Sequence, residues 1–510
     1  MSEKRQRRSR RGRRLVPSIE QRPWGQPENV YPPIDLISAD AVEAIHRQSL
    51  RILSEIGVTF KSPEAVAYFR KAGAIVMEDD ACVRIGEDIV GEALQTVSRS
   101  SVLTPRNPDR KVTIGSNKLA FATVLGPPNC SDLERGRRPG TLEDFSNFVR
   151  LAQHFNIIHL LAGSPVEPMD VPVPIRHLKS TQRMLELSEK VPYVFCHSKQ
   201  RIWDVLEMIA ISRGLELEDL EHNASTYSII NSNSPLQYDT AMAEGLIELA
   251  KFNQPSLITP FSVAGASMPI SIAGATSLAN AEMLAGLVLT QLVRPGAPVV
   301  NGSKTVPVDM RTGSLADASP ESNKALQIGA QLSRFYGLPY RAACFSNSTS
   351  PDAQAGYESH SQLWAAVTSG THMLLHAAGW LETGLCASFE KFVLDIDMLQ
   401  AMSVYLDPVE VSEETLAFAE IAGVGQGGHY FSTEHTMTEY QNAFYRPIVF
   451  EAKGFEQWQE EGSQDAAVRA HSVYKQALDE YQTPDMPQDR AEALEAFVAR
   501  RVEAGGAPID

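Results

Sequence analysis

The chain has 510 residues, of which 43% are apolar and 21% charged, the balance of a globular protein and not of a disordered one. Its net charge of −16, without an aromatic-interleaved basic stripe, argues against nucleic-acid binding. No run approaches the roughly 20 uninterrupted apolar residues of a membrane span, and no apolar stretch follows the basic start, so we expect neither membrane insertion nor secretion. The five cysteines are odd in number and lack a CxxC pair, which favours a reducing cytoplasm.

Residues 1–25 are expected to form a basic arm. Lysine and arginine supply eight of the first fourteen residues, whereas the chain as a whole is acidic. Such a charge run is most often a solvated, mobile arm. The charge asymmetry also favours an arm that docks onto an acidic face of a sister subunit or another partner.

Residues 26–115 are expected to be mainly helical and to pack on the rest of the chain. Asp40 and Glu43 have the spacing of a capping box, and apolar residues follow at helical intervals from Val42 to Ile56. Gly57 then ends the predicted helix. This pattern indicates packing and carries no chemistry.

Residues 116–385 contain eight apolar or β-branched runs, each followed by a segment of helical length. The predicted helices have recognisable starts, such as Thr141 with Asp144 and Ser350 with Pro351. No GxGxxG follows a run, which disfavours a doubly wound open sheet. We therefore predict an α/β fold with a TIM (β/α)8 barrel, an N-terminal helical extension and a C-terminal helical segment. The runs start at Leu119, Ile157, Pro192, Thr226, Pro255, Ala297, Tyr340 and Thr371.

Residues 386–510 are predicted to form the C-terminal helical region, with a Gly-rich loop at 423–436. In a barrel of this kind the site lies at the carboxyl ends of the strands, so residues after each run become candidates. Cys130, Cys196, Cys344, His197 and His376 fall near that rim, and thiolate with imidazole suits zinc. Cys196 and Cys344, however, lie inside apolar runs, where a free cysteine more often behaves as a small core residue. Aromatic residues at strand ends favour a quaternary ammonium ligand held by cation–π attraction, with loop packing as the alternative.

Four stretches carry a resemblance to the trimethylamine methyltransferase family: RPGAPVVNGSKTVPVDMRTG, SPDAQAGYES, LLHAAGWLETGLCASFEKFVLD and GGHYFSTEHT. The basic N-terminus is similar to the start found there. The resemblance implies a barrel methyltransferase that moves a methyl group from an amine to the cobalt of a corrinoid (cobalamin) on a separate protein. It also implies a homo-oligomer without a tightly bound metal.

Founding members of that family carry a pyrrolysine near the motif matched by SPDAQAGYES, whereas this chain has only Ser346 to Ser350 there. A quaternary ammonium needs no such activator, because cobalt(I) can displace a neutral tertiary amine from it. The hypothesis is therefore demethylation of a quaternary amine of the betaine or carnitine type. The small loop leaves room for this substrate, and a large side chain in place of Thr349 should block it.

The site residues expected from this reading fall into five groups. Phe345, Trp380 and Tyr430 supply rings, and Ser346, Asn347 and Thr349 supply space. Glu382, His376 and His429 are the catalytic candidates, with Glu382 balancing the cation. Asn231, Asn301, Lys304, Arg311 and His197 are candidates for binding the rest of the substrate, including its carboxylate. Gly427, Gly428 and His435 are candidates for facing the corrinoid, a loop with surface histidines being the alternative.

Two other functions stay open from the sequence. A zinc-dependent methyltransferase on the same barrel would use the cysteine and histidine residues near the rim. A non-catalytic binder of quaternary amines would keep the aromatic residues and lack methyl transfer.

Overall fold

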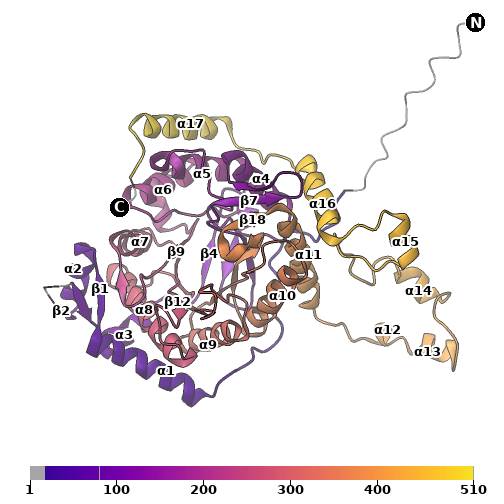
Figure 1. Ribbon diagram of the computed structural model, residues 1–510, viewed down its shortest axis with the longest axis horizontal. Coiled ribbons are helices and arrows are strands. Elements are labelled where there is room, and N and C mark those ends of the chain that lie inside the picture. Colours follow the sequence, from indigo (N-terminus) through magenta and orange to yellow (C-terminus); the bar gives the residue numbers. More distant parts are fainter. Residues whose placement is uncertain (1–17, 78, 80, 509–510) are drawn as a thin grey trace, which may run out of the picture.

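The computed structural model describes residues 18–77, 79 and 81–508, so most of the expected basic arm lies outside the described residues. Helices surround a central group of short strands, and the segments that carry α12 to α15 extend away from this body on one side (Figure 1). The buried apolar side chains form one continuous core that spans the N-terminal region, the central strands and the C-terminal helices.

The N-terminal region begins with the predicted helix, and its start differs slightly from the prediction. Helix α1 (Ala39–Arg51) is capped by Ser38, whose side chain accepts a hydrogen bond from the amide of Ala41. It continues as the π-helix η1 (Ile52–Ile56) and ends at Gly57, which has a φ of 92°. A small sheet of order β10-β1-β3-β2 and the β4–β5 hairpin accompany the helices, so the region is less helical than its sequence suggested. Its other elements are β1 (Val58–Phe60), α2 (Pro63–Lys71), β2 (Ile75–Met77), β3 (Cys82–Arg84), α3 (Glu87–Thr96), β4 (Ser101–Leu103), η2 (Pro108–Arg110) and β5 (Val112–Ile114).

The eight predicted strand runs lie in parallel, each next to the one that follows it in the chain. One sheet joins β9 (Ser228–Ile230), β11 (Ser256–Ile258) and β13 (Val299–Asn301), and another joins β15 (Arg341–Ala343), β16 (Met373–Ala378) and β6 (Ala120–Thr123). The last run, β16, therefore pairs with the first, β6. Single parallel bridges join the remaining neighbours: Ala122 with Leu160, Leu160 with Val191, Tyr193 with Tyr227, and Asn301 with Tyr340.

Helices connect and cover these strands. Thr141 caps α4 as predicted, because its hydroxyl accepts a hydrogen bond from the amide of Asp144. The prediction that Ser350 caps the helix after the seventh strand run was wrong. Asp352 caps α10 by accepting from the amide of Ala355, and Ser350 donates to Asp352 instead. The helices are α4 (Leu142–His154), α5 (Val173–Leu187), α6 (Lys199–Arg213), η3 (Leu217–Glu221), α7 (Thr240–Lys251), α8 (Ile272–Val293), α9 (Pro320–Tyr336), α10 (Ala353–Thr368) and α11 (Phe389–Tyr405).

Helix α8 is long and apolar enough to cross a membrane by length and composition alone. It is instead wrapped by protein: 78% of its most apolar window is buried, and it contacts α1, α2, α3 and α7. Its high apolar content is explained by burial on nearly all sides.

Short strands that the sequence did not predict extend the central group beyond its carboxyl ends. The hairpin of β7 (Asn129–Asp132) and β8 (Gly136–Pro139) joins β18 (Cys386–Ser388) and β17 (Trp380–Leu381) in one sheet, with the short helix η4 (Glu382–Gly384) between β17 and β18. Across the group, β12 (Phe261–Ala264) pairs in parallel with β14 (Lys304–Pro307). Strand β10 (Gln237–Tyr238) belongs to the N-terminal sheet.

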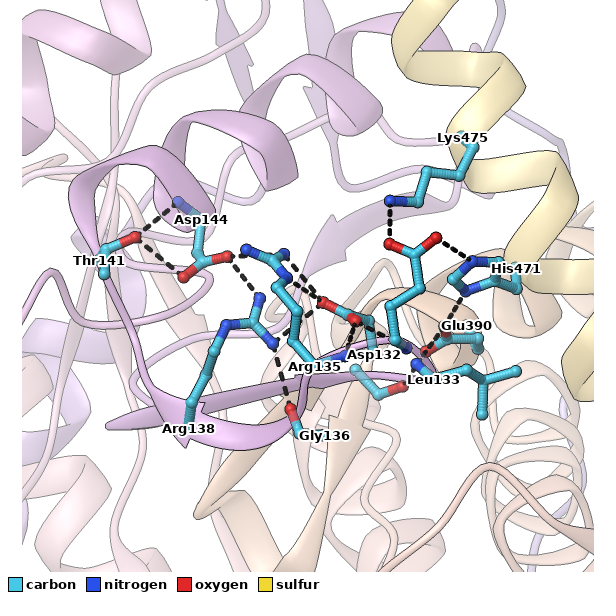
Figure 2. Close-up of polar contacts among 12 residues, drawn as sticks. Asp132, Leu133, Arg135, Gly136, Arg138, Thr141, Asp144, Glu390, His471 and Lys475 are labelled. Atoms are coloured by element: carbon cyan, nitrogen blue, oxygen red, sulfur yellow. Dashed lines mark hydrogen bonds and ion pairs between the residues drawn. The ribbon is translucent and has the colours of Figure 1, made fainter.

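The C-terminal region returns to the body through α16, which packs on α11 and α4. Figure 2 shows the polar contacts that join them. His471 of α16 lies 2.8 Å from Glu390 of α11, and Lys475 lies 2.7 Å from Glu134 in the turn between β7 and β8. These contacts fix the turn against α16. The helices are α12 (Glu413–Leu416), α13 (Phe418–Val424), α14 (Glu434–Glu439), α15 (Phe455–Glu460), α16 (Ala466–Glu480) and α17 (Gln488–Glu503).

Two aspartates, Asp132 at the end of β7 and Asp144 on α4, also hold the β7–β8 hairpin in place (Figure 2). Asp132 and Asp144 are almost fully buried and both form ion pairs with Arg135 and Arg138. Burial opposes the ionisation of Asp132, but hydrogen bonds from Arg135 and the charge of Arg138 outweigh it and lower the pKa of this carboxyl. The charged network thus orders a hairpin that also presents Arg137 to the strand ends.

Candidate active site

A cavity of about 200 Å³ opens where the parallel strands end. Such a volume suits a small metabolite, because cavities for drug-sized ligands are larger. Its lining comes from six of the eight parallel strands and the residues that follow them, and the carboxyl ends of such strands are where parallel α/β folds bind ligands. The lining residues are Leu125, Ile229, Asn231, Thr259, Pro260, Phe261, Gly302, Lys304, Arg341, Phe345, His376 and Trp380.

Three rings form one side of the cavity, which we call the aromatic wall: Phe345, His376 and Trp380. The ring centroids of Phe345 and Trp380 lie 4.5 Å apart, those of His376 and Trp380 4.5 Å apart, and those of Phe345 and His376 5.1 Å apart. The indole N–H of Trp380 is buried and has no partner among the described residues. The wall can therefore offer both ring faces and one unused hydrogen-bond donor.

His376 reaches the wall through an unusual backbone conformation. Its φ is 53°, in the left-handed region that residues with a Cβ seldom adopt, and the pairing of β16 with β6 shifts register between Leu374 and Ala378. The ring Nδ1 accepts a hydrogen bond from the amide of Leu125 at 3.2 Å, which leaves the proton on Nε2. Burial, together with the charges of Arg341 and Lys304, lowers the pKa of His376 well below its ordinary value. The ring is therefore neutral at physiological pH.

Two buried cationic side chains face the aromatic wall. The ammonium of Lys304 lies 3.6 Å from the centroid of the Phe345 ring and donates to the side-chain oxygen of Gln362 at 3.1 Å. The Nε of Arg341 is buried without a hydrogen-bond partner in the described part of the chain. Such an unused charged donor is costly unless a ligand pairs with it.

Burial lowers the pKa of both cationic side chains. Burial and the nearby Arg341 lower the pKa of Lys304 to about 7, although Asp317 opposes the shift. Burial also lowers the pKa of Arg341 to about 10, so that Arg341 keeps its charge at neutral pH. The twelve lining residues include no acidic side chain. The cavity therefore combines aromatic faces with an electropositive end.

The polar loop 346–350 is organised by one carboxylate on α10. Glu358 accepts hydrogen bonds from the hydroxyl of Ser346 at 2.7 Å and from the amides of Asn347 and Ser348 at 2.8 and 3.3 Å. Asn347 also accepts from the amide of Asp317 at 3.1 Å. The loop is thus a fixed support immediately after Phe345. Its Thr349 side chain is exposed and is not among the residues that line the cavity, where its small size was expected to leave room for the substrate.

The structure brings together five of the candidate residues named from sequence. Asn231, Lys304, Phe345, His376 and Trp380 all line the cavity. Asn231 accepts a hydrogen bond from the hydroxyl of Thr259, another lining residue.

Other candidates lie near the strand ends without lining the cavity. Glu382 is engaged by Arg137, whose Nε lies 2.9 and 3.0 Å from its two carboxylate oxygens. Asn301 is buried and bonds to Ser333 and the amide of Ser303. His197 and Arg311 are exposed, and Arg311 pairs with Asp309.

The candidates from the Gly-rich loop lie farther out. Residues 427–431 and 434–435 belong to an exposed segment, and none of them lines the cavity. The structure thus gives no contact between the cavity and Gly427, Gly428, His429, Tyr430 or His435.

Metal ligation finds no support in the side-chain geometry. Among the described residues, no group of three His, Cys, Asp or Glu side chains is arranged to hold an ion. Burial raises the pKa of Cys130, Cys196 and Cys344 to about 12, so these thiols stay protonated. The zinc-dependent alternative therefore lacks a ligand set in this part of the chain.

Sequence reasoning missed Arg341, Gln362 and Glu358. Arg341 had a visible signal, since a charged residue stood alone in the apolar run YRAACF. Glu358 and Gln362 are spaced by four residues on one helical face, but only the tertiary structure shows that this face points inward.

One solved structure shares this fold. The monomethylamine methyltransferase of Methanosarcina barkeri is similar with a TM-score of 0.50 over 89% of this chain and 90% of that one, at 12% sequence identity. The likeness at this identity concerns the fold alone.

Sequence comparison then gives the family. The profile described as Trimethylamine methyltransferase (MTTB) matches residues 3–506, and the chain belongs to this family of methyltransferases. The glycine betaine methyltransferase of Desulfitobacterium hafniense (strain Y51) is 35% identical over 473 residues, 92% of this chain and 98% of that protein. A trimethylamine methyltransferase MttB of Methanosarcina barkeri is 27% identical over 493 residues, 92% of this chain and 96% of that protein.

Proposed function

We propose that this protein transfers a methyl group from a zwitterionic quaternary amine, of the betaine or carnitine type, to the cobalt(I) of a corrinoid carried by a separate protein. We further propose that its ring of parallel strands is a (β/α)8 barrel, since the first and last strands pair. The observation that carries the substrate proposal is the composition of the cavity: aromatic faces, two cations and no acidic lining residue. The relative named as a glycine betaine methyltransferase supports the same substrate class.

The ammonium end of the substrate lies against the aromatic wall. A quaternary ammonium has no N–H to donate, so it is recognised by ring faces rather than by hydrogen bonds. Trp380 and Phe345 supply such faces, and neutral His376 adds a third ring without adding positive charge.

The carboxylate end pairs with Arg341 and Lys304. Their charges would repel a simple organic cation, but a zwitterion brings the anion that both side chains need. Arg341 gains a partner for its buried Nε, and Lys304 gains a counter-charge that favours its protonated form. Trimethylamine offers no anion and cannot make either interaction.

Catalysis rests on orientation. The corrinoid supplies cobalt(I), a nucleophile that takes the methyl group, while the carbon–nitrogen electron pair stays on the departing neutral amine. The residues of this chain need move no proton, which agrees with a neutral His376 and a Glu382 held by Arg137. Pinning both ends of the substrate aims one methyl group outward for in-line transfer.

The partner reaches the methyl group from the strand-end side. Phe261 lines the cavity and is also exposed, and Met310 and Leu385 are exposed on neighbouring strand-end segments. These apolar side chains offer a partner surface beside the opening. The free cysteines agree with a cytoplasmic location, which is part of the proposal.

A methyl-transfer assay tests the function. The purified protein is mixed with chemically reduced cob(I)alamin and one of a series of amines, and the cobalt(I) absorbance is followed as it converts to methylcobalt. We expect conversion with glycine betaine or carnitine and none with tetramethylammonium, choline or trimethylamine. Conversion with trimethylamine alone would overturn the proposal. Tight betaine binding by calorimetry without any conversion would instead favour a non-catalytic binder.

A further inference from the structure

Residues 408–447, which we call the C-terminal arm, form helices without a core. Helices α12, α13 and α14 contain no buried residue, and no residue of the arm is buried. Figure 1 shows these helices lying away from the body. Helices of four to seven residues are not stable alone in water, so the arm needs a surface to cover it.

The arm is also too apolar to be a solvated linker. Phe418 is 76% exposed, and Phe431 and Phe444 are each 84% exposed. Large exposed apolar side chains in this number mark an interaction surface. The large exposed apolar residues of the arm are Val409, Val411, Leu416, Phe418, Ile421, Tyr430, Phe431, Met437, Tyr440 and Phe444.

The body carries a matching apolar surface, which we call the α10–α11 groove. It is a hollow of about 860 Å³, larger than the candidate active site, between α10, α11 and the start of α16. Its apolar lining includes Tyr357, Trp364, Met398, Met402, Tyr405 and Phe450. Tyr357 is 70% exposed, so the groove is open on the solvent side.

We propose that the arm of one copy of this chain fills the α10–α11 groove of a second copy. The arm leaves the body just after Tyr405 and rejoins it near Phe450, and both residues line the groove. The two surfaces therefore lie next to each other on one side of the molecule. A two-fold pairing of copies brings each arm to the other copy's groove and closes both interactions at once.

The area available is sufficient for a stable pair. The five exposed aromatic rings of the arm, at roughly 200 Å² each and about two-thirds exposed, offer roughly 700 Å² per arm, or about 1,400 Å² for two arms, the size of a standard protein interface. The arm also carries six glutamates and one arginine, which keep the free surface from nonspecific association.

The test measures particle mass by light scattering on the full chain. The arm variant is Phe431→Asp with Phe444→Asp, and the groove variant is Tyr357→Asp with Met398→Asp. The matched control is Ile75→Asp, an exposed apolar position in β2, outside both surfaces. We expect an oligomer for the wild type and the control, and monomers for both variants, with dissociation constants raised at least 100-fold.

Mixing separates arm exchange from a simple surface contact. The arm variant keeps an intact groove, and the groove variant keeps an intact arm, so an equimolar mixture should form a hetero-oligomer that neither variant forms alone. The arm residues are exposed, so their substitution does not threaten folding, and circular dichroism checks this for both variants. A monomeric wild type at micromolar concentration would overturn the proposal. An arm variant that stays oligomeric, or a folded mixture that stays monomeric, would overturn it as well.

Discussion

The side-chain amide of Gln362 joins Lys304 to the main chain of Phe345. Its oxygen accepts from the Lys304 ammonium at 3.1 Å, and its nitrogen donates to the carbonyl oxygen of Phe345. One residue on α10 therefore sets the position of both a cation and a ring of the cavity. Gln362→Leu should raise the KM for glycine betaine about 10-fold, since each lost bond at a buried site is worth about 1 kcal/mol. Steady-state kinetics check this, and Gln182→Leu on α5 serves as the control. An unchanged KM would contradict the bridging role.

Arg341 should determine selectivity for substrates with a carboxylate. Arg341→Met removes a charged hydrogen-bond donor worth about 1.5–3 kcal/mol, so betaine affinity should fall roughly 10- to 150-fold. Tetramethylammonium, which lacks a carboxylate, should bind no more weakly than to the wild type. Calorimetric titration of both ligands measures the difference. Arg311→Met, at an exposed position, is the control and should leave both affinities unchanged. Equal losses for both ligands would point to general damage of the cavity.

The aromatic wall should recognise charge as well as shape. Trp380→Leu should weaken betaine binding about 10-fold or more, because a desolvated cation–π contact is worth about 2 kcal/mol. Trp380→Phe should retain most of the affinity. The carbon isostere 3,3-dimethylbutanoate has the same shape without the positive charge, and its binding should fall much less. If both ligands lose affinity equally, the indole acts by packing alone.

Betaine affinity should depend on pH through Lys304. The pKa of this lysine is lowered to about 7, so its ammonium loses its proton as the pH rises through 7, and the carboxylate then loses a counter-charge. The dissociation constant should therefore be lowest below pH 7 and rise above it. Lys304→Met should bind more weakly and lose this dependence between pH 6 and 8. A wild-type affinity that is constant over this range would contradict the assignment.

Two substitutions distinguish the role of Glu358, which holds the loop 346–350 in place, from the role of the exposed Thr349. Glu358→Gln keeps the size of the side chain but weakens the acceptor for Ser346, Asn347 and Ser348, and should lower kcat about 10-fold. Thr349→Trp, in contrast, should leave betaine binding within about twofold because Thr349 is exposed. The sequence alone had suggested that a large side chain there would block the substrate. Loss of betaine binding in Thr349→Trp would support the interpretation from sequence and contradict this prediction.

The repeat of apolar runs was enough to locate the central strands, because buried parallel strands need apolar residues on both faces. All eight runs lie in parallel pairs or bridges. The rim strands β7, β8, β17 and β18 were missed, since each has only two to four residues, too few for a periodic pattern. The pairing of β7 with β18, which joins these strands into one sheet, depends on residues more than 200 positions apart.

The candidate site was predicted only in part, because residues that follow apolar runs can be placed from the sequence and their distant partners cannot. Rings and a lysine directly after apolar runs could be placed at the strand ends, as Phe345, Trp380 and Lys304 show. The role of Glu382 as a free counter-charge could not be tested from sequence, because its partner Arg137 belongs to the missed hairpin. The Gly-rich loop could not be placed at all, since nothing local fixes where an exposed segment lies.

The burial of α8 among other elements of the protein has a consequence for biosynthesis. A segment of 22 apolar-rich residues leaving the ribosome unprotected would invite aggregation or capture by the membrane-insertion machinery. Helices α1, α2, α3 and α7 precede it in the chain and are translated first, whereas α9, β13 and β14, which also contact it, follow it. The order of translation thus makes part of the covering surface available before α8 emerges, and α9, β13 and β14 complete the cover afterwards.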